Sequence, residues 1–100
     1  MKQMQQMLMQ AQKMQRQLQK AHAELEQKEF TVEKAGLVTV VLTGDKKVKS
    51  ISIDKDALNP DDAEMVEETI VSAINEAIEK ITAEANAIDE EITGRSGGLY

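Results

Sequence analysis

The 100-residue chain contains no cysteine, a single proline and only two aromatic residues, Phe30 and Tyr100. The lack of cysteine excludes a disulfide framework and a thiolate metal site, and it is typical of proteins of the reducing cytosol. The lack of aromatic rings argues against a platform on which single-stranded nucleic acid stacks its bases. The core must therefore come from Val, Ile, Leu and Met, and it is thin for a monomer of this length.

Long hydrophobic runs are missing as well. The apolar runs are only a few residues long, too short for a membrane span, and glutamines interrupt every apolar stretch near the basic start. That pattern argues against a signal peptide, which needs a continuous apolar segment. These absences predict a cytoplasmic protein that forms one small domain.

Acidic residues are absent from the first 23 positions. This segment carries Lys2, Lys13, Arg16 and Lys20, a net charge of +4, whereas the whole chain has a formal net charge of −6. The other 77 residues therefore sum to −10. An acidic protein that keeps positive charge in one segment is a candidate for binding a polyanion locally while repelling it elsewhere.

The same N-terminal segment has the apolar spacing of a helix that packs on another helix. Apolar residues recur at alternating intervals of three and four, the a and d positions of about three heptads. Lys13, Arg16 and Lys20 fall at c and f positions, so we expect a solvent-facing basic stripe. Such a stripe is either the solvated face of a helix pair or a phosphate-binding surface, and the absence of acid before Glu24 favours the second. The predicted seam consists of Met4, Met7, Ala11, Met14, Leu18, Ala21 and Leu25.

From Glu29 onward the apolar period changes from helical to alternating. Three short strands are predicted in an antiparallel meander, with turns at residues 35–36 and 44–47 and the third strand at residues 48–54. The middle strand is apolar on both faces, which is typical of a strand covered on both sides. We therefore expect a dimer interface that includes Val38, Val40 and Leu42. Lys46, Lys47 and Lys49 form a second basic cluster, suited either to solubility or to contact with a ligand.

A long C-terminal helix is predicted to follow. Asn59 is a good cap, Pro60 suits the first helical position, and apolar stripes persist to Thr93. Gly94 is the expected stop, so residues 1–94 form a single α-β-β-β-α domain and residues 95–100 a flexible Gly-rich tail. The fold class is α+β, and because helices of roughly 40 and 50 Å outrun a compact body, we expect a dimer with projecting helices.

Residue patterns for chemistry are few. His22, the only histidine, is expected to be an exposed helix residue, because catalysis would need a base or nucleophile beside it. The acids between residues 54 and 64 are not an EF-hand, since Asn59 and Met65 stand where its Gly and Glu would be. No phosphate-binding glycine pattern follows a strand. The sequence predicts a protein that is not an enzyme, with no metal, cofactor or small-molecule substrate.

The centre of the chain resembles the YbaB/EbfC family of bacterial nucleoid-associated proteins. The most specific segments are residues 36–40 (Gly-Leu-Val-Thr-Val), 48–54 (Val-Lys-Ser-Ile-Ser-Ile-Asp) and 58–62 (Leu-Asn-Pro-Asp-Asp), and residues 11–15 and 73–77 agree. The chain departs in its Gly-Asp-Lys hairpin, where the family often has Asn-Gly, and in ending at Tyr100.

The resemblance implies a cytoplasmic, nucleoid-associated homodimer that binds double-stranded DNA and alters its shape, with paired helices projecting from a central sheet. It carries over no catalytic residues, so the DNA-binding assignments rest on the charge map alone: Lys13, Arg16, Lys20, Lys46, Lys47 and Lys49. The main alternative is a prefoldin-like coiled-coil holdase, which would bind unfolded chains through apolar helix tips. A membrane-binding helix is disfavoured, because the first helix lacks Trp and Phe anchors.

Overall fold

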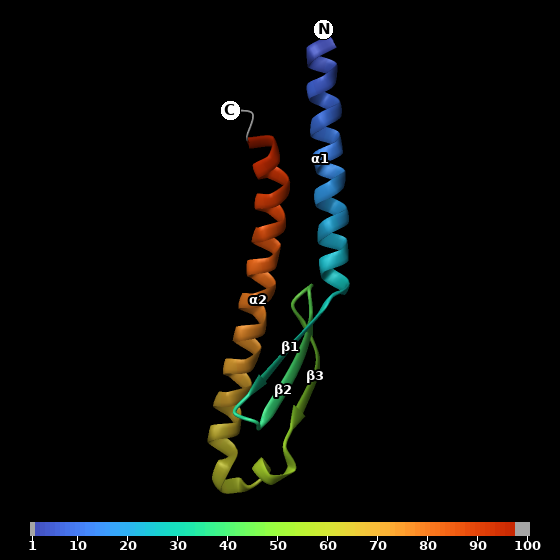
Figure 1. Ribbon diagram of the computed structural model, residues 1–100. Helices are drawn as coiled ribbons and strands as arrows, with labels where there is room; N and C mark the ends of the chain where they lie inside the picture. The colour runs from blue at the N-terminus through green and yellow to red at the C-terminus, as the bar shows by residue number, and fades with distance from the viewer. Residues whose placement is uncertain (1, 98–100) are drawn as a thin grey trace.

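The computed structural model describes residues 2–97, and the side chains of residues 2–94. An N-terminal helix, a three-stranded sheet and a C-terminal helix follow one another along the chain (Figure 1). The strands pair in sequence order, all antiparallel, so the predicted α+β fold and its meander are confirmed. The elements are α1 (Lys2–Gln27), β1 (Glu29–Lys34), β2 (Val38–Thr43), β3 (Lys47–Ile53), the 3₁₀ turns η1 (Lys55–Ala57) and η2 (Pro60–Asp62), and α2 (Ala63–Gly97).

The two helices make the molecule long and narrow. They run antiparallel and side by side beyond the sheet, and the chain measures 72 × 22 × 15 Å (Figure 1). Its radius of gyration is 20.0 Å, against about 13 Å for a compact chain of 100 residues. His22 Nε2 lies 2.7 Å from Asp89 Oδ1, and Lys28 Nζ lies 2.6 Å from Glu84 Oε1. The first pair shows which turns of α1 and α2 lie side by side, and the second joins the residue that follows α1 to α2.

The core lies between α2 and one face of the sheet. Alternate residues of β1 and β2 point to this face, because successive side chains of a strand point to opposite sides. The helix contributes Ala73 and Ala77, which are fully buried and small enough to let α2 approach the strands closely. The buried strand residues are Phe30, Val32, Val38, Val40 and Leu42.

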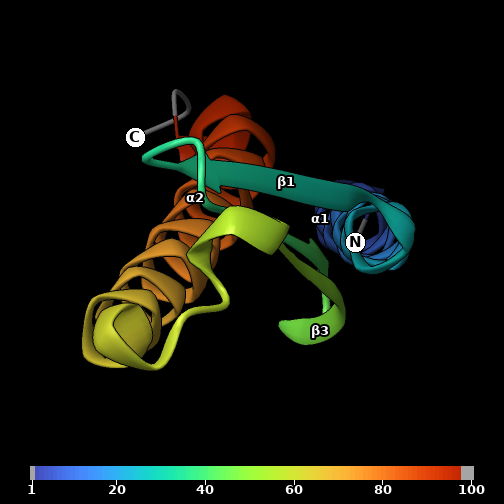
Figure 2. The same ribbon diagram turned by 90° about the horizontal axis from the view of Figure 1, so that it is seen from below.

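The sheet is covered by α2 on one face only, and not across its full width. On the middle strand the second face carries Thr39, Val41 and Thr43, which are half-buried, so the expected two-sided cover is absent within one chain. α2 packs on β1 and β2 and leaves β3 at the far edge (Figure 2). Val48 and Ile51 of β3 pair with Leu42 and Val40 on the core face, yet they are 46% and 43% exposed. The core face therefore continues into an uncovered flank.

Both ends of the C-terminal helix differ from the prediction. The Asn59 side chain accepts a hydrogen bond from the Asp61 N–H at 3.2 Å, as a cap should, but the turn that follows is 3₁₀ and α2 begins at Ala63. Gly94 does not end the helix, which continues to Gly97. A glycine costs a helix only about 1 kcal/mol, which a helix of 35 residues tolerates. Of the predicted tail, residues 98–100 lie outside the described part of the chain.

The turn between β1 and β2 places a non-glycine residue in a left-handed conformation. Ala35 and Gly36 have φ of 55° and 65°, and the Leu37 N–H donates to the Lys34 carbonyl at 2.9 Å. Positive φ at both central residues of this four-residue turn is the pattern of a type I′ turn, for which Asn-Gly is the preferred sequence. Ala35 is therefore strained.

We expect Ala35→Asn to stabilise the protein by about 1 kcal/mol or less, because asparagine adopts the left-handed region more readily than alanine. Thermal unfolding should show a midpoint a few degrees higher. Ala35→Val should lower the midpoint, since β-branched residues are disfavoured at positive φ. Equal midpoints for the two variants would contradict the strained turn.

The turn between β2 and β3 packs against the end of α1. The Gly44 N–H donates to the Lys28 carbonyl at 2.9 Å. A Cβ added at Gly44 would lie 1.7 Å from the Leu25 carbonyl oxygen, so only glycine allows this approach. The contact holds the N-terminal helix in place on the sheet.

Candidate nucleic-acid interface

The apolar seam residues of α1 become more buried from the N-terminus of the helix toward the sheet. Leu25 is 6% exposed, the seam residues from Met14 to Ala21 are half-buried, and Met4 and Met7 are each 70% exposed. Because His22 lies beside Asp89, the last residue of α2 comes about level with residue 14 of α1. The first dozen residues of α1 therefore extend beyond α2, and we call residues 2–11 the N-terminal arm.

The predicted basic stripe lies on the outer side of α1. Lys13, Arg16 and Lys20 are all exposed, and they occupy about 10 Å along the helix. Within residues 2–94, none of the three forms an ion pair with an acidic side chain. Their charges are thus available to an external anion.

Uncharged polar groups surround the centre of this stripe. Gln12, Gln15 and Gln19 line a shallow recess of about 320 Å³ together with Arg16. Amide groups of this kind donate hydrogen bonds to phosphate and sugar oxygens in protein–DNA contacts.

Lys2 belongs to the same stripe, although the sequence-based assignment omitted it. It is exposed and lies two heptads before Arg16, at the same f position. The heptad register that identified the other three residues was the signal that could have found it. With Lys2 included, the stripe extends over about 27 Å of helix.

The second basic cluster, at the β2–β3 hairpin, is partly neutralised. Lys49 forms an ion pair with Glu29, and Lys47 Nζ lies 3.7 Å from Asp45 Oδ2. The Thr43 hydroxyl donates to Asp45, and this bond, with the nearby Lys47 charge, holds the pKa of the Asp45 carboxyl below its ordinary value. Lys46 is exposed, and no ion pair to it occurs within residues 2–94. The hairpin should therefore bind anions more weakly than the sequence, with its three lysines within four residues, suggests.

The hairpin and the stripe nevertheless follow one another along the molecule. The contact between Gly44 and the end of α1 keeps the hairpin at the base of this helix, and the basic stripe begins about two turns farther along it (Figure 1). Along the length of the molecule, the exposed Lys46 is therefore followed by Lys20, Arg16 and Lys13.

The residues predicted to form a dimer interface lie inside the single chain. Val38, Val40 and Leu42 are buried beneath α2, which leaves almost none of their surface for a second copy to contact. Sequence alternation identified them as core-facing but could not show that α2 of the same chain covers them.

Other residues that the sequence singled out have structural contacts. Asp54, one of the acids between residues 54 and 64, accepts a hydrogen bond from the Asp56 N–H at 2.9 Å, which makes it the cap of η1. His22 is paired with Asp89 and is not simply exposed. Within residues 2–97 no cluster of three or more His, Asp or Glu side chains could hold a metal ion. None of the described helices is long and apolar enough to cross a membrane.

The architecture is that of an α+β protein with projecting helices, one of which carries a basic and unpaired face. Residues 1–96 match the YbaB/EbfC DNA-binding family, and the chain belongs to that family. Relatives described as nucleoid-associated proteins include one from Ruminiclostridium cellulolyticum, 42% identical over 96% of this chain and 84% of the relative. Another, from Clostridium botulinum strain Eklund 17B, is 46% identical over 97% of this chain and 88% of the relative.

Proposed function

We propose that the protein acts in the bacterial nucleoid, in the cytoplasm, where it binds duplex DNA as a homodimer and alters the conformation of the DNA. The observation that carries this proposal is the unpaired basic stripe of α1. It lies in a segment of 23 residues without acid, in a chain whose net charge is −6. Membership of a DNA-binding family and the names of the relatives support the same function.

The charge distribution favours contact through the N-terminal helix. Phosphate contacts from lysine and arginine supply most of the sequence-independent affinity for DNA. The strongly acidic remainder of the chain repels DNA, so binding is confined to α1 and the adjoining hairpin. No aromatic residue occurs in α1 that could stack on a base, which favours a duplex over a single strand.

Dimerisation through β3 would cover the open flank of the core face. Val48 and Ile51 continue the buried rows of β2, and an exposed edge strand offers unpaired backbone groups to a second copy. Val38, Val40 and Leu42 would then support the interface from the neighbouring strand without lying on its surface.

We expect Ile51→Glu to give a monomer and Ser50→Glu to remain a dimer, as judged by sedimentation equilibrium at micromolar concentration. Both changes add one carboxylate to β3, but Ile51 faces the core side and Ser50, which pairs with Val41, faces the opposite side. A charge buried in an interface without a partner is costly. The reverse result would place the interface on the other face, and a monomeric wild-type protein would remove the dimer altogether.

A dimer would present two basic helices to one duplex, and contacts at two separated points can bend or compact DNA. A mixed-sequence duplex with a fluorescence donor and acceptor at its ends tests this step. We expect energy transfer to change as the protein saturates the duplex. Binding with unchanged transfer would leave a DNA-binding protein that does not deform its ligand.

One observation favours a second function, that of a holdase. The N-terminal arm exposes Met4, Met7, Leu8 and Met9, as an apolar helix tip for unfolded chains would. A holdase would suppress the aggregation of an unfolded client at high and low salt alike. DNA binding, in contrast, weakens steeply with salt.

A further inference from the structure

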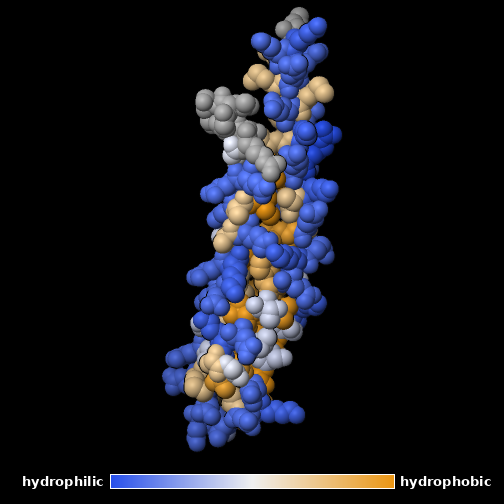
Figure 3. Space-filling model, viewed as in Figure 1, coloured by the Kyte–Doolittle hydropathy of each residue, from blue (hydrophilic) through white to orange (hydrophobic). Residues whose placement is uncertain are grey.

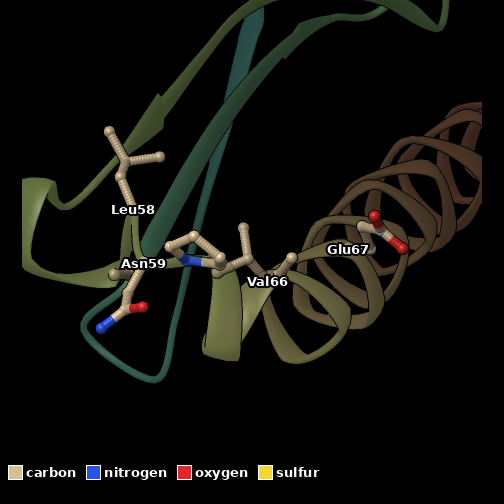
Figure 4. A pocket seen from close by; sticks show the side chains of 7 residues that line it. Leu58, Asn59, Val66 and Glu67 are labelled. Atoms are coloured by element: carbon tan, nitrogen blue, oxygen red, sulfur yellow. The ribbon is translucent and has the colours of Figure 1, made fainter.

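An apolar groove lies at the end of the molecule opposite the N-terminal arm. It is formed between the 3₁₀ turns and the first turns of α2, and its volume is about 360 Å³. Val66 points from α2 toward the turns, and Leu58, which is 65% exposed, lies on the opposite side (Figure 4). We call this the elbow groove; its other apolar lining residues are Ala57, Pro60 and Ala63.

The surroundings of the elbow groove are strongly acidic. Residues 54–68 contain seven acidic side chains and one lysine. Glu67 lines the groove itself, and Asp61 and Glu64 are exposed beside it. A ligand for this site should combine apolar side chains with positive charge.

The N-terminal arm has these two properties. Met4, Met7, Leu8 and Ala11 follow helical spacing along one side, and the exposed arm appears as isolated apolar patches above the continuous seam between the helices (Figure 3). Lys2 and Lys13 flank them, with no acid nearby in the sequence. Methionine side chains adapt to irregular apolar grooves. Met4, Met7 and Leu8 are 61–70% exposed, so the arm gains from having these apolar side chains covered.

We propose that the N-terminal arm of one copy docks in the elbow groove of a second copy, so that the protein associates end to end. Because the molecule is 72 Å long and the arm and groove lie at opposite ends, one chain cannot fill its own groove (Figure 1). In an end-to-end arrangement that does not close into a ring, every pair keeps one free arm and one free groove. Such association is open-ended and distinct from the β3 dimer.

Sedimentation velocity without DNA tests this proposal independently of DNA binding. At low ionic strength the average mass of the wild-type protein should rise with concentration, beyond that of the dimer or monomer unit seen when dilute. Added salt should reduce the rise, since charge attraction around the groove is screened.

Two variants locate the two surfaces. Met4→Gln with Met7→Gln and Leu8→Gln removes the apolar side of the arm, while glutamine preserves helicity. Leu58→Gln with Ala63→Gln alters the groove at exposed positions. Each variant alone should show no concentration-dependent rise in mass. An equimolar mixture should recover an increase in mass, because an intact arm then meets an intact groove, and the increase continues beyond pairs only if each variant is itself a dimer through β3.

Val71→Gln is the matched control, as an exposed apolar residue of α2 outside the groove, and it should associate like the wild type. Circular dichroism establishes that every variant is folded. A loss of association in the arm variant alone, without rescue by mixing, would show arms pairing with each other and overturn the proposal. A wild-type mass independent of concentration would overturn it as well.

Discussion

Replacing Lys13, Arg16 and Lys20 together with glutamine is expected to weaken binding to duplex DNA by more than about tenfold, for every sequence alike. The three side chains are exposed and form no ion pairs with described residues, so their replacement breaks no internal salt bridge. The slope of log affinity against log salt should shrink by about 0.9 for each phosphate that the variant no longer neutralises. Gel shifts over a range of salt concentrations measure both quantities.

A variant with the same change in net charge separates direct phosphate binding from overall charge. Lys34, Lys55 and Lys80 lie outside α1 and the hairpin, and their replacement with glutamine should leave the salt slope nearly unchanged. Lys34 Nζ lies 3.0 Å from Glu76 Oε1, so thermal unfolding must first show that this variant stays folded without that ion pair. Helicity should survive in the stripe variant, because glutamine is a good helix former and the positions lie off the seam. If the two variants bind DNA equally weakly, the stripe is only a solvated surface and binding depends on the net charge of the protein.

Gly44→Ala is expected to destabilise the protein by about 1–3 kcal/mol, the usual cost of forcing an extra methyl group into a packed site. The new Cβ would lie 1.7 Å from the Leu25 carbonyl oxygen, so the hairpin and the end of α1 must separate. The nearest atoms all belong to the backbone of Leu25 and Glu26, so no side-chain rotation relieves the clash. The thermal midpoint should fall by about 4–8 °C for each kcal/mol in a chain of this size.

Gly94→Ala is the control for this substitution. Gly94 lies within α2, and an added Cβ meets no atom within 4 Å. Alanine should therefore stabilise the helix by about 0.5–1 kcal/mol. We also expect limited proteolysis to cut α1 faster in Gly44→Ala, because the end of the helix no longer packs against the β2–β3 turn. Midpoints that shift in the same direction for the two glycines would contradict the close approach at Gly44.

Periodicity predicted those parts of the fold that depend on local spacing. The seam from Met4 to Leu25 predicted α1, and the alternation around Val38 and Val40 predicted the core face of β2. The predicted helix end at Gly94 was wrong, because glycine permits a helix to stop without requiring it. The apolar stripe through which α2 packs does not depend on the residue at position 94.

The features that could not be predicted depend on how the elements pack. The position of α2 across β1 and β2 decides that Ile51 stays open while Val40 is buried. The length by which α1 extends past α2 decides that Met4 is exposed and Leu25 is not. Lys49 looked available in the sequence, but Glu29 reaches it across β2 from a strand twenty residues away. Pairing of this kind is visible only in three dimensions.

The measurement that tests the central proposal most directly is the salt dependence of binding between the wild-type protein and random duplex DNA. With three phosphate contacts from each helix of a dimer, log affinity should fall linearly with log salt with a slope of about −5. The slope should be the same for duplexes of unrelated sequence, because phosphate contacts carry no sequence information. No detectable binding at low salt, or a slope near zero, would contradict an electrostatic DNA interface on α1.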